Sequence, residues 1–298
     1  MLGAIAACES DRVLPGDYGS PDAGGAGAGG ASPPRDGATL TASEEAGEPA
    51  DPRCDISGRW VVALRVLADA IGQKQASHNW YYYEISQTGD QVTVTKGLHC
   101  GYEIVPVTSL AASVNSQGAW AGILTHDSDT GRMGTMAVTA SGCRLAIEKR
   151  YTVRGATVSF YSDPTQTMPT ASQQAAGNTP GWEDWDMDGN PGITLTVGEG
   201  GSNLGDLYCA QRDWNQWGGP VPYSATKFSV PATWGSEQDA LGYSGSSLVT
   251  QSAAPDADAS QHYVWFAKLG PTQATGDDAT ICAEVRSLVR TLTPGALK

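Results

Sequence analysis

Short runs of alternating apolar and polar residues, separated by turn residues, follow one another from Cys54 onward and limit the possible folds most strongly. In residues 143–151, apolar side chains alternate with charged ones, as they do in a half-buried β-strand. The turn sequence Thr-Gly-Asp at 88–90 separates two further runs at 80–86 and 92–95, which indicates a hairpin. Other strands are predicted at 57–66, 133–140, 193–197, 206–212 and 226–230. Antiparallel sheet should therefore dominate this part of the chain.

A single clear helix is predicted near the end of the chain. Apolar residues recur at helical spacing from 281 to 292, acidic residues at 277 and 278 suit the positive end of a helix, and Pro-Gly at 294–295 stops it. A Pro-rich stretch near 162–192 is predicted to be a long loop, which either separates two subdomains or decorates one. We interpret residues 54–298 as one β-rich globular domain that carries this loop.

The first 53 residues have a different composition from the rest of the chain. Ile5-Ala6-Ala7-Cys8 resembles the lipobox of bacterial lipoproteins, in which small residues precede a cysteine that is acylated and becomes the new N-terminus. The resemblance implies that residues 1–7 are the remainder of a signal peptide and that Cys8 carries a lipid anchor. Residues 8–53 are rich in Gly, Ala and Pro, and their acidic residues outnumber the basic ones. We therefore expect a solvated, disordered tether there.

The cysteines indicate an oxidising compartment. All six stand singly, without a C-x-x-C pair that would suggest a zinc site or a redox motif. If Cys8 is acylated, two disulfide bonds and one free thiol are expected in the folded part, and Cys100 with Cys143 is the preferred pair. The candidates are Cys54, Cys100, Cys143, Cys209 and Cys282. Together with the lipobox, they predict an exported protein of the cell envelope, anchored to a membrane by its lipid.

Charge and aromatic composition narrow the range of partners. The formal net charge is −14 and no basic run is present, so nucleic acid is not an expected partner. No apolar run approaches the roughly 20 residues that span a bilayer. Nine Trp and eleven Tyr, against three Phe, suit half-exposed sheet faces and binding surfaces. A small apolar molecule or a glycan is therefore a reasonable ligand.

Two further resemblances concern the folded part. Gly58-Arg59-Trp60 resembles the G-x-W motif of lipocalins and other calycins, where a first-strand Trp plugs one end of a barrel that binds small ligands. A broader set of segments, at 54–60, 78–84, 97–101, 181–186 and 275–278, looks like uncharacterised secreted lipoproteins of myxobacteria. That resemblance implies export and brings no known activity. The predicted fold class is mainly β, either an antiparallel sandwich or a calycin-like barrel with a C-terminal helix.

The sharpest local motif is an acidic loop. Three alternating Asp followed by Gly resemble the first half of an EF-hand-type calcium loop, where carboxylates at positions 1, 3 and 5 converge on one ion. Leu195 stands at position 12 in place of the bidentate Glu, so Glu183, Glu199 or a distant carboxylate would have to complete the shell. The alternative is an acidic turn whose Asp side chains bond their own backbone. The candidate Ca²⁺ ligands are Asp184, Asp186, Asp188 and Asn190.

No catalytic motif is evident. The four histidines, His78, His99, His126 and His262, lack H-E-x-x-H spacing. His126 and its acidic neighbours could act as base and orienter, yet no nucleophile accompanies them, and the sequence Gly-Tyr-Ser-Gly-Ser at 242–246 does not match G-x-S-x-G. The sequence therefore favours a binding or structural module of the cell envelope. The alternative is a secreted hydrolase whose site is assembled from distant residues.

Overall fold

The computed structural model describes residues 5–6, 51–70, 73–106, 127–171, 181–199, 202–245, 249–250 and 254–292. Cys8 and most of the proposed tether therefore lie outside the described residues. The strands are β1 (Ile5–Ala6), β2 (Gly58–Ala70), β3 (Gln73–Thr88), β4 (Gln91–Pro106), β5 (Met133–Thr139), β6 (Gly142–Arg154), β7 (Ile193–Glu199), β8 (Ser202–Val221), β9 (Lys227–Gly245), β10 (Val249–Thr250), β11 (Ala254–Pro255) and β12 (Tyr263–Lys268). The helices are η1 (Pro52–Cys54), α2 (Val158–Tyr161), η2 (Ala259–Gln261) and α3 (Asp278–Leu292).

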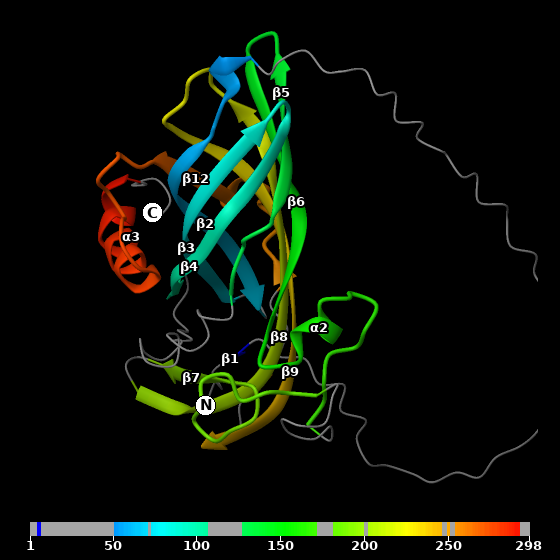
Figure 1. Ribbon diagram of the computed structural model, residues 1–298. Coiled ribbons are helices and arrows are strands. Elements are labelled where there is room, and N and C mark those ends of the chain that lie inside the picture. The colour runs from blue at the N-terminus through cyan, green and yellow to red at the C-terminus, as the bar shows by residue number, and fades with distance from the viewer. Residues whose placement is uncertain are drawn as a thin grey trace, which may run out of the picture.

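Eight of the strands form a closed antiparallel ring (Figure 1). Around the ring the order is β2, β3, β4, β5, β6, β8, β9 and β12, and β12 pairs with β2 to close it. Strand β7 adds to β8, and β11 adds to β2. The mainly β, antiparallel prediction is confirmed. Of the two architectures considered, the closed ring corresponds to the barrel, because its strands do not separate into two sheets.

Strand β2 shows how the sequence pattern produces the two faces of the ring. Trp60 and Val62 belong to the buried cluster inside the ring, whereas Val61 and Ala63 belong to a separate buried cluster outside it. Successive side chains of a strand point to opposite faces, so a run that is apolar at every position is expected where both faces are covered. Within the predicted run at 57–66, residues 60–64 have this character.

Helix α3 covers the outer face of β2, β3 and β4 (Figure 1). Its buried residues Ile281, Val285 and Val289 pack with the outward side chains of these strands, including Trp80. The predicted helix is confirmed, and Asp277 accepts a hydrogen bond from the backbone N–H of Thr280 at its first turn. The helix thereby makes β2 and β3 internal to the molecule on both faces.

One end of the ring is closed by aromatic side chains. Trp60 is fully buried, donates its indole N–H to the Ile56 carbonyl at 2.8 Å, and packs edge-on against Phe228 and Phe266. The amine of Lys268 lies 5.4 Å from the centre of the Trp60 ring. Trp60 therefore belongs to the apolar core at one end of the ring, and the G-x-W resemblance stays a prediction.

The described parts of the long loop lie against the outer face of β6, β8 and β9. Tyr161 and Met168 form a small buried cluster with apolar side chains of these strands. Arg212, which is buried on β8, donates to the carbonyls of Tyr161, Asp163 and Gln166 at 2.9 to 3.0 Å. One guanidinium thus holds three carbonyls of the loop against β8.

A candidate ligand site inside the strand ring and an acidic loop

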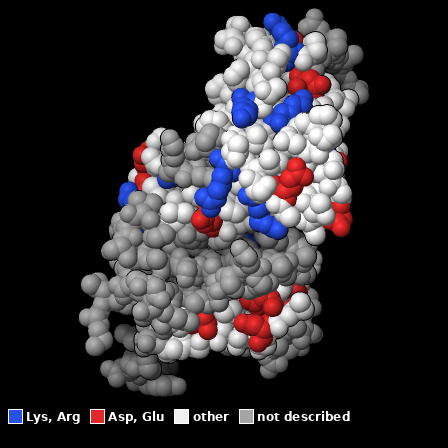
Figure 2. Space-filling model, turned by 90° about the vertical axis from the view of Figure 1, so that its left-hand side faces the viewer, with Lys and Arg blue, Asp and Glu red and all other residues white. Residues whose placement is uncertain are grey.

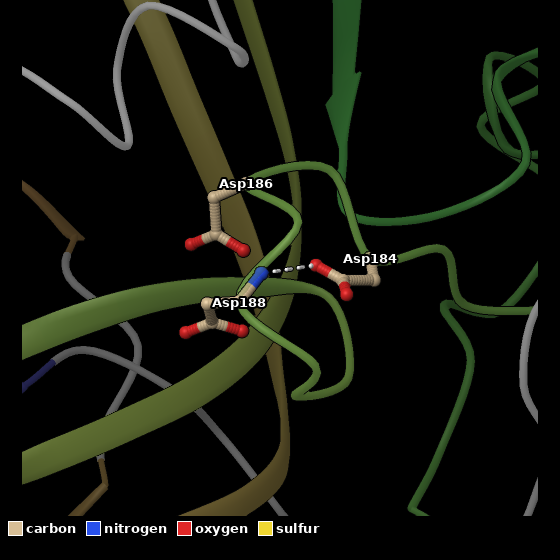
Figure 3. Close-up of side chains that lie close together, drawn as sticks. All are labelled: Asp184, Asp186 and Asp188. Atoms are coloured by element: carbon tan, nitrogen blue, oxygen red, sulfur yellow. Dashed lines mark hydrogen bonds between the residues drawn. The ribbon is translucent and has the colours of Figure 1, made fainter.

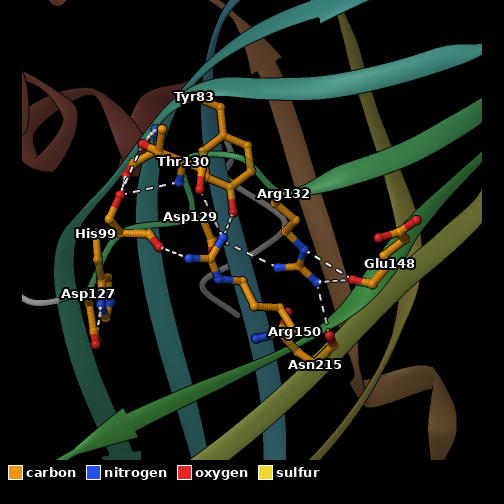
Figure 4. A network of polar contacts seen from close by, with 11 residues as sticks. Tyr83, His99, Asp127, Asp129, Thr130, Arg132, Glu148, Arg150 and Asn215 are labelled. Atoms are coloured by element: carbon orange, nitrogen blue, oxygen red, sulfur yellow. Dashed lines mark hydrogen bonds and ion pairs between the residues drawn. The ribbon is translucent and has the colours of Figure 1, made fainter. Parts of the chain in front are cut away.

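A network of charged and aromatic side chains lies inside the ring, beyond the apolar end that Trp60 plugs (Figure 4). It is drawn from strands that are distant in sequence and from the segment that precedes β5. Its members are Tyr81, Tyr83, His99, Asp127, Asp129, Arg132, Arg150, Arg154, Gln211 and Asp213.

One half of the network is centred on Asp129. Its carboxylate accepts a hydrogen bond from the hydroxyl of Tyr83 and forms ion pairs with Arg132 and Arg150, each at 3.3 Å. Arg132 also donates to the Glu148 and Asn215 carbonyls at 2.9 to 3.2 Å. This half joins β3, β6 and β8 across the ring, and the donors of Arg132 are used by protein groups.

The other half is centred on Asp127. Its Oδ2 atom lies 3.0 Å from Nδ1 of His99 and 2.8 Å from Nε of Arg154. Arg154 also donates to Asp213 at 2.6 Å and to Gln211 at 3.0 Å. The side chains of His99, Asp127 and Arg154 are all more than nine-tenths buried. Buried ion pairs of this kind need hydrogen bonds to offset the loss of hydration.

The surroundings fix the protonation of the charged groups. Burial raises the pKa of Asp127, but the charge of Arg154 and the hydrogen bond from His99 outweigh it, so the pKa lies below its ordinary value. Burial lowers the pKa of Arg154, and the charges of Asp127 and Asp213 reverse this to give a net rise. Burial, followed by the charge of Asp129, raises the pKa of Tyr81. Asp127 and Arg154 are therefore charged at neutral pH, and Tyr81 is not.

Two acceptor atoms of the network are unused. Oδ1 of Asp127 and Nε2 of His99 are buried and have no hydrogen-bond partner among the described residues. Buried polar atoms in proteins nearly always have a partner, so each such atom requires an explanation. A ligand inside the ring would supply one.

Aromatic rings flank the unused acceptors. The His99 ring stacks on Tyr81 with ring centres 4.6 Å apart, and Tyr83 stacks on Trp217 at 5.9 Å. The guanidinium of Arg132 lies 4.0 Å from the centre of the Trp217 ring. These flat faces suit a ligand with an apolar or ring-shaped body.

The acidic loop lies elsewhere, immediately before β7 (Figure 3). Asp184, Asp186 and Asp188 offer carboxylate oxygens that lie within 4.8 Å of one another. Asp184 accepts from the backbone N–H groups of Asp188 and Gly189 at 3.2 and 2.9 Å, and Gly189 has a φ of +85°, as a tight turn requires. The structure thus brings the three predicted Asp ligands together.

Hydrogen bonds from neighbouring residues stabilise the carboxylates of the loop. Thr194 donates its backbone N–H to Asp186 at 2.8 Å and its hydroxyl to Asp188 at 2.6 Å. Burial and the charge of Asp188 raise the pKa of Asp186, whose Oδ1 is buried without a partner among the described residues. The side-chain amide of Asn190 donates a hydrogen bond to Oδ2 of Asp188 at 3.1 Å.

Of the two residues named for completing the metal shell, Glu183 has a partner of its own, and the side chain of Glu199 lies outside the described part of the chain. Glu183 accepts from the indole N–H of Trp185 at 3.1 Å, and Leu195 at position 12 offers no oxygen from its side chain. The hydrogen bonds within the loop are also those that the acidic-turn alternative requires. Calcium binding by this loop therefore stays a prediction.

The disulfide bonds correct one prediction and confirm another. Two bonds are present with one free thiol, as expected, but they join Cys54 to Cys143 and Cys100 to Cys282, and Cys209 is free and buried. The preferred pairing of Cys100 with Cys143 is wrong. Cys100 points outward toward α3, whereas Cys143 points into the ring, so the two lie on opposite faces of the sheet. Disulfides are typical of oxidising environments.

The histidines do not converge. His99 lies inside the ring, whereas Nε2 of His262 bonds the Asp256 carbonyl at 2.9 Å and its Nδ1 accepts from Leu67 and Trp234. His126 lies outside the described residues, and its neighbour Asp127 bonds His99 instead. One sequence signal could have revealed this network: a polar residue at a position where the alternation of a strand predicts an apolar, inward-facing one. Among the described residues, no Ser, Thr or Cys bonds Nε2 of His99.

The comparisons with known proteins give no family. No protein-family model, no curated protein and no solved structure matches this chain. In the described part of the chain, no helix has both the length and the apolar character needed to cross a bilayer. On the face shown in Figure 2, Lys and Arg side chains are scattered among uncharged and acidic surface. Function therefore has to be argued from the interior network and the acidic loop.

Proposed function

We propose that this protein is an exported binding protein that holds a small molecule inside the strand ring. The observation that carries the proposal is the pair of buried, unpartnered acceptors, Nε2 of His99 and Oδ1 of Asp127, beside stacked aromatic rings. Leaving such atoms unpaired costs about 1–3 kcal/mol each, which a bound ligand would recover. The alternative hydrolase has less support, because His99 has no nucleophile among the described residues.

Export and anchoring belong to the same proposal. The two disulfide bonds support folding in an oxidising compartment. Ile5-Ala6-Ala7-Cys8 supports acylation at Cys8, which would tether the ring to a membrane by lipid alone. In bacterial cells that export the protein, labelled palmitate should mark it, and Cys8→Ser should remove the label. Label that persists in Cys8→Ser would refute the anchor and leave the binding proposal intact.

Equilibrium dialysis with two probes tests binding. We expect saturable binding of 2-methoxynaphthalene, a flat apolar molecule, or of methyl β-glucoside, a small glycan. Trp217 lies inside the ring, whereas Trp214 lies on the outer face under the amine of Lys149, so the two residues locate the probe. Binding should change tryptophan fluorescence in the wild type and in Trp214→Phe, and the change should shrink in Trp217→Phe.

Two outcomes would contradict the proposal. Neither probe binds, or the fluorescence change is as large in Trp217→Phe as in the wild type. The first result would mean that the interior does not admit a ligand, and the second that the probe binds outside the ring.

A further inference from the structure

We infer that the ligand is a neutral molecule that donates a hydrogen bond, such as an alcohol or a phenol, to Nε2 of His99. The inference rests on the proposed binding function and adds the chemical class of the ligand. It follows from the charge balance of the interior network, from the proton that His99 shares with Asp127, and from the aromatic rings beside them.

The charges of the network balance. Three carboxylates, Asp127, Asp129 and Asp213, face three guanidinium groups, those of Arg132, Arg150 and Arg154. Each carboxylate has at least one guanidinium partner within 3.3 Å. A charged ligand would add an uncompensated charge to this buried region, and burying such a charge is costly. The balance therefore favours a neutral ligand.

The contact between His99 and Asp127 sets the direction of the ligand's hydrogen bond. The ionised carboxylate of Asp127 can only accept, so the proton between Oδ2 and Nδ1 belongs to His99. When Nδ1 carries the only proton of the ring, Nε2 carries a lone pair and is an acceptor. Oδ1 of Asp127 is also an acceptor. Each unused atom is therefore an acceptor to which a ligand can donate a hydrogen bond.

The neighbouring rings define the rest of the ligand. Tyr81 stacks on His99, and Tyr83 and Trp217 follow along the same interior surface. Tyr81 is protonated at neutral pH, since burial raises its pKa, so this wall carries no negative charge of its own. A hydroxyl group on a flat or apolar body can donate to Nε2 of His99 while the body lies beside the rings.

Four naphthalenes that differ in one substituent test the inference. The probes are 2-naphthol (neutral donor), 2-methoxynaphthalene (neutral, no donor), 2-naphthoate (anion) and 2-naphthylmethylamine (cation at neutral pH). We expect 2-naphthol to bind about tenfold more tightly than 2-methoxynaphthalene, a difference of about 1.4 kcal/mol, and more tightly than either ion. In His99→Phe the preference for 2-naphthol should fall to about onefold.

His78→Phe is the matched control. His78 is also a buried histidine without hydrogen-bond partners among the described residues, but it adjoins Arg65 and Arg290 rather than the interior network. The tenfold preference should persist in this variant. A preference that falls equally in both variants would mean that it does not depend on His99.

A measurement on the unaltered protein avoids any folding defect of the variants. With ¹⁵N-labelled histidine, the Nε2 resonance of His99 should shift when 2-naphthol is added and not when 2-methoxynaphthalene is added. Equal affinity for these two probes, with no selective shift, would overturn the inference and leave the proposed binding function standing. Tightest binding of either ion would overturn the neutral class. Failure of all four probes and of methyl β-glucoside would remove the proposed function as well.

Discussion

Asp127 is held by two partners, Arg154 and His99, in a place where an unpaired charge would be costly. Such a pair contributes little to stability compared with apolar residues of the same volume. Removing one partner nevertheless destabilises the protein, because the other charge stays buried without compensation. The pair is therefore better understood as a device that fixes positions. It fixes the orientation of the His99 ring, which also stacks on Tyr81.

Arg154→Leu tests this reading. The substitution leaves Asp127 and Asp213 without their shared guanidinium, so we expect the free energy of unfolding to fall by about 3–5 kcal/mol. Arg144→Leu is the control, because Arg144 is an exposed arginine on the same strand, and its loss should change stability by about 0.5 kcal/mol or less. Urea unfolding of both variants measures the difference. Equal effects would mean that the interior pair is not buried as described.

His78 gives a pH-dependent prediction. Burial lowers its pKa from 6.5 to about 4, helped by the charges of Arg65 and Arg290, while Glu103, its neighbour on β4, pairs with Arg290. Between pH 6.5 and about 4, His78 is protonated in the unfolded chain and neutral in the folded chain. The stabilisation by neutral His78 is therefore complete above pH 6.5 and is lost as the pH falls to about 4, by roughly 2–3 kcal/mol.

Urea unfolding at several pH values between 4 and 6.5 checks this prediction. In His78→Phe the slope of stability against pH should be shallower than in the wild type, because the proton uptake by the unfolded state is gone. An unchanged slope would assign the pH dependence to other groups.

At the scale of single elements, the strands that carry a clear alternation were predictable and the polar interior was not. Residues 143–151 alternate apolar and charged side chains, and they lie within β6. Strand β12, which closes the ring, went unpredicted, because its six residues Tyr-Val-Trp-Phe-Ala-Lys are nearly all apolar and show no alternation. The hydrogen bond from His99 to Asp127 depends on the pairing of β4 with the segment before β5, where Leu98 bridges Ser128, and no local pattern expresses that pairing.

The acidic loop offers a prediction at the same scale. Burial, and after it the charge of Asp188, raises the pKa of Asp186, and an ion would relieve the repulsion between these carboxylates. Without an acidic residue at position 12, affinity should lie in the range of extracellular modules, about 10⁻⁴ to 10⁻³ M. Trp185 is buried beside the loop, so its excitation should produce emission from bound terbium that calcium competes away.

Two aspartate variants distinguish an ion site from an acidic turn. Asp186→Ala should abolish the terbium emission. Asp163→Ala should leave it unchanged, because Asp163 accepts from Thr165 in a turn outside the cluster. Emission that is absent in the wild type, or that persists in Asp186→Ala, would assign the loop to the acidic-turn alternative.

At the scale of the whole molecule, the two disulfide bonds hold different parts together. Cys54–Cys143 ties the segment before β2 to β6 at the plugged end of the ring, and Cys100–Cys282 ties α3 to β4. Each bond should stabilise the protein by about 2–4 kcal/mol, mainly by restricting the unfolded chain. Sequence could give the number of bonds, but the pairing depends on which face of the sheet each cysteine occupies.

Non-reducing peptide mapping checks the pairing. We expect one peptide that joins residues 54 and 143, a second that joins 100 and 282, and an unpaired Cys209 that reacts with thiol reagents only after unfolding. Cys282→Ser should lower the denaturation midpoint more than Cys209→Ala. Recovery of a peptide that joins 100 and 143 would contradict the arrangement of the ring and α3.

The closure of the ring by β2 and β12 also dictates when the protein can finish folding. Trp60 of β2 pairs with Lys268 of β12 at this seam. Strand β2 is the first long strand to be synthesised, and it can pair on this side only after β12, nearly the last strand, has been made. Until then the sheet has two open edges and an uncovered apolar face, which is the condition in which strands of different molecules pair. A message truncated shortly before codon 263 would therefore yield a product that aggregates, although it still contains nearly all of the interior side chains.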